Sequence, residues 1–255
     1  MPEIRSLILA TCMLVMGVPA ASAAQAEHWI TTSKNPCEGL TIGWTPPLAA
    51  LQKVIGPRWQ PAQGPVKGHG ILLLFATSCP QSHIGKHATG PYTIGAVIIP
   101  VQTPKDTRGI RQSNSHGWAV IPDAFGPASG PVMQLFKHHG FAVTDAKVTL
   151  VIHKTAKGNQ ASMSFATAQG RIEVRAMVSG SAKRFDIVSA LAGNDPSRFS
   201  LFTGQESYSR QEQGTAVVTA HGDTWVSHLG LDTKPRLVTL DQAFIWSFRF
   251  LDKPY

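Results

Sequence analysis

The sequence contains little charge and few cysteines. Only 15% of its 255 residues are Asp, Glu, Lys or Arg and 43% are apolar, which excludes a disordered chain and is enough for a sizeable core. The 23 Gly and 18 Pro residues favour turns and interrupt helices. The composition therefore predicts a globular protein with many turns and few long helices.

Long hydrophobic runs are also absent. The apolar run Leu7–Val18 has only about a dozen residues, whereas a transmembrane helix needs about 20. It follows Arg5 and ends at Pro19, and the small residues beyond contain two Ala-x-Ala sites, as in a secretory signal peptide. We therefore expect residues 1–26 to be a cleaved signal peptide and not a retained anchor. The mature chain, 27–255, is predicted to be periplasmic or secreted, without stable membrane insertion.

The three cysteines become a pair once the signal peptide is removed, because Cys12 lies within it. An even pair in an exported protein favours a disulfide between Cys37 and Cys79. The spacing Cys79-x3-His83-x3-His87 is the most metal-like in the chain. Oxidation of Cys79 would remove its thiolate, so no metal site is predicted.

Sequence motifs of several functional classes are missing. The chain has no Gly-x-Ser-x-Gly, no Gly-rich phosphate loop, no His-Glu-x-x-His and no Cys-x-x-Cys. Its net charge is +8, but the basic residues are dispersed and form no recognised nucleic-acid-binding module. We therefore expect no cofactor and no nucleic-acid partner, and the sequence does not indicate an oligomeric state.

Alternating apolar residues predict strands over most of the chain from Val66 onward. The clearest predicted strands are Ile71–Thr77, Tyr92–Val101, Phe141–His153, Ala161–Ala168, Arg171–Ser179, Thr215–Ala220 and Phe244–Phe250. Two short helices are expected. One is Leu48–Val54, and the other begins at Pro131 and ends at Gly140. The expected fold is mainly β (α+β), a single antiparallel β-barrel or cone-like closed sheet system with one or two short helices.

Two stretches resemble the acetoacetate-decarboxylase-like proteins. Gly90-Pro91-Tyr92-Thr93, followed by the apolar run Ala96–Val101, resembles a strand region of that family. After a short helix, Gly140–Val148 resembles the family's Gly-Phe-Pro-Lys-Lys turn. The similar order covers roughly Val66 to Ser179. The resemblance implies a cone-shaped β fold around a pocket.

The family's catalytic residues have no counterpart in this chain. In the decarboxylases a lysine after Gly-Phe-Pro forms the Schiff base. Here Ala142-Val143-Thr144 occupies that stretch, and Lys147 comes too late to match it. The family's acidic residue after Tyr-Thr is Ile94 in this chain. The resemblance therefore implies the fold without lysine-dependent decarboxylation.

Candidate ligand-binding residues lie on two predicted strands. Arg171 and Arg175 share one strand face, which is either solvated or directed into a pocket, where an arginine could bind a carboxylate. Trp246 and Phe248 belong to an aromatic face that forms either core or the wall of an apolar pocket. We name these four as candidate ligand-binding residues, with a small apolar or carboxylate ligand as the expected partner.

His139 is the candidate catalytic residue. It falls on the inward stripe of the second predicted helix, three residues after Phe136, and could act as an acid or a base in a pocket. The alternative is a structural role at the helix C-terminus, where a cation is favoured by the helix dipole.

Three function hypotheses follow. The first is an exported small-molecule-binding protein whose largely apolar pocket takes a carboxylic acid or a carbonyl compound, with Arg171 or Arg175 as the anion partner. The second is an enzyme of acetoacetate-decarboxylase-like fold that acts on a carbonyl substrate through His139, without a Schiff-base lysine. The third is a structural or interaction protein of the cell envelope. The sequence alone does not decide whether the protein is an enzyme.

Overall fold

The computed structural model describes residues 29–32, 36–102, 117–184, 188–193, 199–205 and 209–251. The predicted signal peptide, residues 1–26, lies outside the described residues. The strands are divided between two sheets. The larger contains β1 (Trp29–Thr31), β2 (Cys37–Trp44), β3 (Leu72–Cys79), β4 (His83–Ile84), β5 (His87–Ala88), β6 (Tyr92–Val101), β7 (Trp118–Gly126), β8 (Val143–Asp145), β12 (Lys183–Arg184), β13 (Val188–Ala192), β14 (Phe199–Gln205), β15 (Ser209–Gln211) and β17 (Leu237–Leu251). The smaller contains β9 (Lys147–Thr155), β10 (Gly158–Ala166), β11 (Gly170–Ser179) and β16 (Gln213–Gly222).

The prediction of a mainly β fold is confirmed, and its finer details are corrected. Most strand pairs are antiparallel, but β7 pairs in parallel with both β8 and β13. A closed barrel or cone is not confirmed, because the strands separate into two sheets. Within the larger sheet, β14 pairs with β13 on one side and β17 on the other.

The two predicted helices are present as α1 (Leu48–Ile55) and α2 (Pro131–His138). A third, α3 (Trp225–His228), was not predicted. It begins at Thr224, whose side chain accepts a hydrogen bond from the backbone N–H of Ser227, while the Ser227 side chain accepts one from that of Thr224. This capping box stabilises a helix too short to show apolar periodicity. Within the described ranges, no helix has the length and apolar character of a membrane span.

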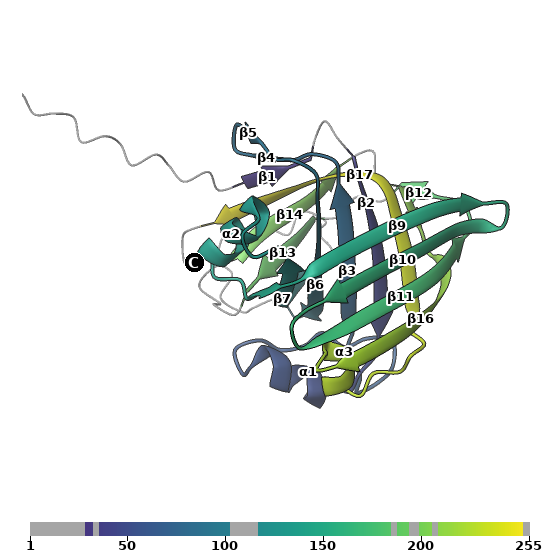
Figure 1. Cartoon of the computed structure of the whole chain (residues 1–255). Helices are drawn as coiled ribbons and strands as arrows, with labels where there is room; N and C mark the ends of the chain where they lie inside the picture. Colours follow the sequence, from purple (N-terminus) through teal and green to yellow (C-terminus); the bar gives the residue numbers. More distant parts are fainter. Residues whose placement is uncertain are drawn as a thin grey trace, which may run out of the picture.

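The smaller sheet packs across one face of the larger sheet. Figure 1 shows β9, β10, β11 and β16 lying in front of β2 and β3, with α2 near one end and α1 and α3 near the other. A buried apolar cluster joins the sheets and includes Val97 of β6, Phe165 of β10 and Val218 of β16. Burial of this shared surface is the main force that holds the layers together.

Gly95 of β6 allows the two sheets to approach closely. A Cβ atom at this position would lie 2.2 Å from Cε1 of Phe165 and 2.6 Å from the carbonyl oxygen of Phe75. The Phe165 ring also packs edge-on against Phe125 of β7, with ring centroids 5.3 Å apart. Any side chain on Gly95 would therefore displace the Phe165 ring or the backbone of β3.

The predicted disulfide between Cys37 and Cys79 is present. It connects the first residue of β2 to the last residue of β3, which are neighbouring antiparallel strands. Cys79 is therefore not a free thiolate. His83 and His87 lie on β4 and β5, which form a tight hairpin around Gly85.

A β-bulge divides β17 into two halves. Asp241 pairs with Gly39 of β2 and Phe244 pairs with Cys37, so β17 contains one residue more than β2 between these pairs. Ala243, inside the bulge, has φ +52°, a left-handed conformation that is unfavourable for a residue with a Cβ atom. Because side chains alternate along a strand, the extra residue exchanges the two faces of β17 at this point.

Candidate functional site

A cavity of about 360 Å³ lies against the face of the larger sheet that points away from the smaller sheet. Strands β2, β3, β6, β7 and β17 supply most of its wall, and Met133 and Phe136 of α2 cover part of it. The wall is mostly apolar. Its polar described residues are Thr41, Thr77, Arg210, Glu212, Thr239 and Asp241.

An ion pair between Arg210 and Asp241 forms the charged part of the wall. The two residues face one another across the β15–β17 pair. Arg210 Nε donates to Asp241 Oδ1 at 2.9 Å and Nη2 donates to Oδ2 at 3.4 Å. The side chain of Asp241 is only 2% exposed and that of Arg210 18%. Because water solvates neither side chain well, each charge is stabilised mainly by the opposite charge of the other.

The aromatic half of β17 lines the cavity beyond the ion pair. The lining residues are Leu237, Thr239 and Asp241 before the bulge, and Phe244, Trp246 and Phe248 after it. The bulge thus keeps both halves of the strand facing the same space. Trp246 and Phe248, two of the predicted ligand-binding residues, are therefore in the cavity wall, and their contact with a ligand stays a prediction.

His139 lies behind the cavity wall. It is 4% exposed, and its ring stacks on Phe250 with centroids 4.1 Å apart and planes 12° from parallel. Neither His139 nor Phe250 is among the described lining residues. The inward direction predicted for His139 is correct, but the aromatic layer separates it from the cavity, so the structure does not place it as an acid or base there.

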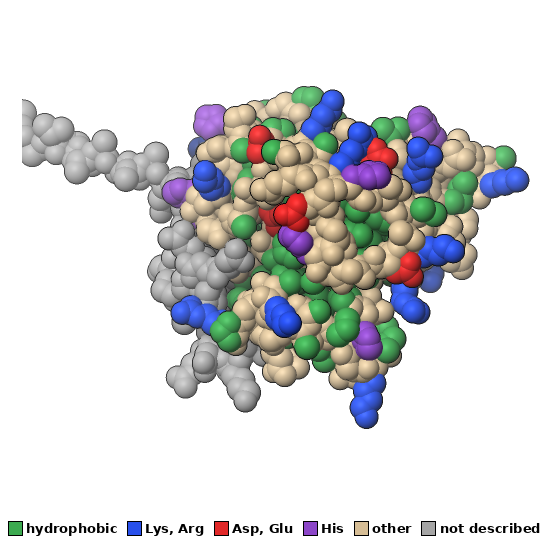
Figure 2. Space-filling view, turned by 60° about the horizontal axis from the view of Figure 1, so that its bottom comes forward, with side chains coloured by type: hydrophobic (Ala, Val, Ile, Leu, Met, Phe, Trp, Pro, Cys, Tyr) green, Lys and Arg blue, Asp and Glu red, His purple; other side chains and the backbone are tan. Residues whose placement is uncertain are grey.

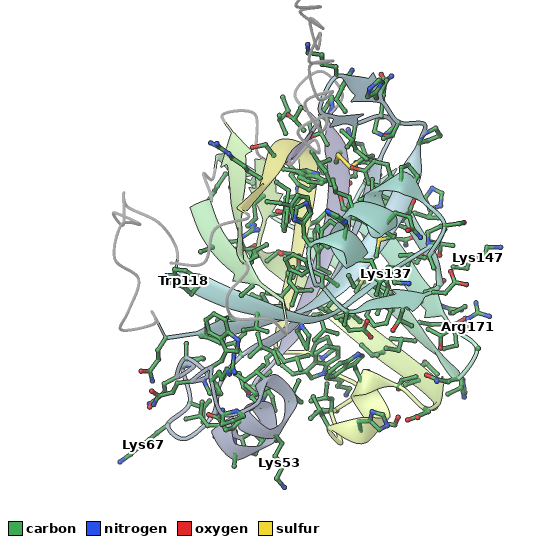
Figure 3. All side chains as sticks on the ribbon, turned by 90° about the vertical axis from the view of Figure 1, so that its left-hand side faces the viewer. Lys53, Lys67, Trp118, Lys137, Lys147 and Arg171 are labelled. Carbon is green, nitrogen blue, oxygen red and sulfur yellow. A yellow bond between two sulfur atoms is a disulfide. The ribbon has the colours of Figure 1, made fainter. Side chains whose placement is uncertain are left out.

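Arg171 and Arg175 lie outside the cavity, on the exposed face of β11. Arg171 forms a 2.5 Å ion pair with Glu173 on that face, and Figure 3 shows Lys147 and Arg171 at the periphery of the molecule, pointing outward. Their even-numbered neighbours Ile172 and Val174 are the buried ones. The structure thus places both arginines on the solvent-facing side of β11, because its apolar face is taken up by the core between the sheets, and their contact with a ligand stays a prediction.

None of the described residues that line the cavity is a lysine or a histidine. At the turn that resembles Gly-Phe-Pro-Lys-Lys, Val143 packs against the apolar cluster around the cavity. Thr144 instead donates a hydrogen bond to Asp123. The described residues also contain no group of three or more His, Cys, Asp or Glu that could hold a metal ion.

Asp123 of β7 is a half-buried carboxylate in a second polar cluster. Its Oδ2 accepts hydrogen bonds from Trp225 Nε1 and Thr144 Oγ1, both at 3.1 Å, and so joins β7 to β8 and α3. Burial raises the pKa of the Asp123 carboxyl above its usual range, and these hydrogen bonds oppose the shift. The charged form is thus disfavoured in the folded protein relative to the unfolded chain.

We expect Asp123→Asn to become more stable relative to the wild type as the pH rises from 4 to 8. A raised folded-state pKa means that the stabilisation by the protonated carboxyl is fully present below the unfolded pKa and is lost as the pH rises through the folded pKa. The amide does not titrate, so the variant lacks this loss. Urea unfolding at several pH values measures the difference, with the exposed carboxyl of Asp232 changed to Asn as the control. A difference between Asp123→Asn and wild type that does not vary with pH would contradict the prediction.

Lysine and arginine side chains are spread over the molecular surface. Figure 2 shows them scattered between hydrophobic and neutral side chains, without one dominant basic patch on the face in view. The absence of a nucleic-acid partner stays a prediction.

Comparison with known proteins gives matches in fold alone. No protein-family model and no curated protein sequence matches the chain. An acetoacetate decarboxylase-like enzyme from Sphingomonas wittichii RW1 has a TM-score of 0.59 at 10% identity, covering 89% of this chain and 92% of that one. A structure of acetoacetate decarboxylase has a TM-score of 0.55 at 11% identity, covering 89% and 90%. The enduracididine biosynthesis enzyme MppR complexed with pyruvate has a TM-score of 0.53 at 12% identity, covering 91% and 92%. The chain therefore has the fold of the acetoacetate-decarboxylase-like proteins, as its sequence resemblance implied.

Proposed function

We propose that the chain is an enzyme that acts on a small, mostly apolar carbonyl compound in the interior cavity, without a Schiff-base lysine. The observation that carries this proposal is an apolar cavity of about 360 Å³ with the buried Arg210–Asp241 pair in its wall. The likeness in fold to acetoacetate decarboxylase-like enzymes supports it, as does the complex of one similar structure with pyruvate, a small carbonyl compound.

Three charged residues supply the chemistry in this proposal. Arg210 would donate hydrogen bonds to the carbonyl oxygen and stabilise negative charge that develops on it. Asp241 holds the guanidinium in position through its two hydrogen bonds. Glu212 lies at the exposed side of the cavity and is the carboxylate that could take a proton from the carbon beside the carbonyl. We assign the polar roles to these residues in place of His139, Arg171 and Arg175.

A panel of short methyl ketones, aldehydes and keto acids tests the proposal. Thermal unfolding measures binding, and proton NMR in D₂O measures both conversion and exchange of the protons beside the carbonyl. We expect the wild type to bind and transform at least one compound. Ile98→Trp, which fills part of the cavity, should lose both signals, whereas Val217→Trp, on the exposed face of β16, should keep them.

Two outcomes would contradict the proposal. One is that no compound in the panel binds, and the other is that binding persists unchanged in Ile98→Trp. Borohydride reduction in the presence of a ketone of the panel that binds should trap no lysine adduct, because no described lining residue is a lysine. A trapped adduct would show that the Schiff-base exclusion is wrong.

A non-catalytic binding protein is the second candidate. It is favoured by the absence of lysine and histidine from the described cavity wall, which leaves few groups suited to proton transfer near neutral pH. This candidate predicts saturable binding of a carbonyl compound with no proton exchange and no product. The same NMR measurement separates the two functions.

Export is part of the proposal. The disulfide between Cys37 and Cys79 supports an oxidising compartment, the periplasm or the cell exterior, because such bonds are rare in reducing cytosol.

A further inference from the structure

The charged side chains among the described lining residues do not add up to a positive site. Of the described lining residues, Arg210 is basic, and Asp241 and Glu212 are acidic, with formal charges of +1, −1 and −1. Their sum is −1 (one positive charge less two negative charges). A ligand that enters this space therefore meets no net positive charge from these residues.

Arg210, the one arginine among the described lining residues, is already engaged by a carboxylate. Arg210 and Asp241 are directly opposite one another on paired strands, so the strand register fixes their contact. Both Nε and Nη2 of the guanidinium donate to Asp241. A ligand carboxylate would have to share this arginine with a buried protein carboxylate, and like charges held close together in a poorly solvated site repel strongly.

The described lining residues also include uncharged hydroxyls. Thr41 of β2 and Thr239 of β17 are direct cross-strand neighbours, and both line the cavity. In the described part of the chain, neither side chain forms a hydrogen bond with another protein group, whereas Thr77 donates to the carbonyl oxygen of Glu38. Paired hydroxyls can satisfy one carbonyl or hydroxyl oxygen of a ligand, but they do not neutralise a charge.

The rest of the wall penalises a charged ligand. It is built mainly from aliphatic and aromatic side chains, including Leu73, Phe75 and Ile98. A carboxylate moved from water into such a space loses its hydration and needs a compensating positive charge, whereas a ketone needs only one hydrogen bond. The cavity therefore favours the uncharged compound of a pair with equal apolar length.

We propose that the cavity selects uncharged carbonyl compounds over carboxylates of the same size. This inference rests on the proposed function and specifies its substrate class: ketones or aldehydes with an apolar chain, and not keto acids or fatty acids. The selecting elements are the internally neutralised Arg210–Asp241 pair, the carboxylate of Glu212 and the hydroxyls of Thr41 and Thr239.

A matched pair of ligands tests the selection in the wild-type protein. 2-Heptanone and heptanoate have the same number of carbon atoms and differ in charge. Titration calorimetry at neutral pH, with quenching of tryptophan fluorescence from Trp118 and Trp246 in the wall as a second signal, gives both affinities. We expect 2-heptanone to bind at least tenfold more tightly than heptanoate.

Two glutamate variants test whether the selection comes from the cavity. Glu212→Gln removes one acidic group from the wall and should strengthen heptanoate binding several-fold relative to the binding of 2-heptanone. Glu173→Gln removes the same charge from the exposed face of β11 and should change neither affinity. Both sites are accessible to solvent, so we expect both variants to fold.

The outcomes separate this inference from the proposed function. Heptanoate binding that equals or exceeds 2-heptanone binding would overturn the selection and leave a carbonyl- or carboxylate-binding cavity in place. Equal effects of Glu212→Gln and Glu173→Gln would also overturn it, because the preference would then reflect the overall charge of the protein. Failure of both ligands to bind would overturn the selection together with the proposed function.

Discussion

Replacing Arg210 by Met, or Asp241 by Leu, should each destabilise the protein by about 3 kcal/mol, while the double variant should remain within about 1 kcal/mol of the wild type. Each single change removes the opposite charge of this ion pair from beside a largely buried charge, since the two side chains are only 18% and 2% exposed. The double change removes both charges and fills the space with apolar groups of similar size. Chemical denaturation of the four proteins measures the coupling between the two residues.

An exposed ion pair on the same protein provides the control. Arg171 and Glu173 are of similar chemical type, but their side chains are 57% and 37% exposed. We expect Arg171→Met to change stability by less than about 1 kcal/mol, because solvent screens exposed pairs. The contrary result would be a double variant that loses as much unfolding free energy as the two single variants together. In that case Arg210 and Asp241 would not be coupled, and each charge would be accommodated in the cavity wall independently of the other.

Gly95→Ala should cost about 3 kcal/mol of stability, near the upper end for adding one carbon to a packed core. The new Cβ would lie 2.2 Å from the Phe165 ring and 2.6 Å from the backbone oxygen of Phe75, and real contacts are never this short. Either the ring must leave its position or the two sheets must separate. Urea unfolding of the wild type and the variant measures the loss.

Gly90→Ala is the matched control for this change. It lies just before β6, is exposed, and an added Cβ would meet no atom within 4 Å. We expect little change there. Gly95→Ala should cost less stability in a Phe165→Leu background than in the wild type, because the smaller side chain at position 165 can move aside. An equal loss from Gly95→Ala in both backgrounds would place the strain at the Phe75 carbonyl.

The sequence predicted strands well where one apolar run belongs to one strand. Tyr92–Val101 was expected as a strand and is β6 at both ends. Phe141–His153 was expected as one strand but is interrupted at Ala146, so that β8 pairs in the larger sheet and β9 in the smaller. Continuous apolar character does not report which sheet a strand joins, because that choice depends on partners distant in the chain.

Strands that contain turn-forming residues were missed. β2 includes Gly39 and Gly43 and lies before Val66, where no strand was predicted. A Cβ at Gly43 would come within 2.8 Å of the Leu73 side chain, so its glycine serves a close contact between strands and not a turn. β7 was missed for a similar reason, since Pro122 and Asp123 interrupt its apolar pattern.

The site was only partly predictable. Trp246 and Phe248 follow a regular alternation, and the structure places them in the cavity wall. Asp241 would fall on the opposite face if the alternation of Phe244 and Trp246 were extended backward, because nothing in the composition marks the extra residue at the bulge. Arg210 was missed because Ser209-Arg210-Gln211 is uniformly polar, and its burial depends on pairing with β17. The one local signal was Asp241 itself, an isolated acidic residue that follows the mostly apolar stretch Val238–Leu240 and precedes the aromatic segment that begins at Phe244.

Because of the bulge in β17, deletion of a single residue there would change which side chains face the interior, even without any substitution. Loss of one codon at Gln242 or Ala243 would leave every other amino acid unchanged, yet it would turn the six residues from Phe244 to Arg249 over as a block. The aromatic rings would then face outward, and Ile245, Ser247 and Arg249 would face the cavity. Two homologues that differ by a single alignment gap at this point could therefore recognise chemically opposite ligands, so a comparison of such proteins should give that gap more weight than many substitutions.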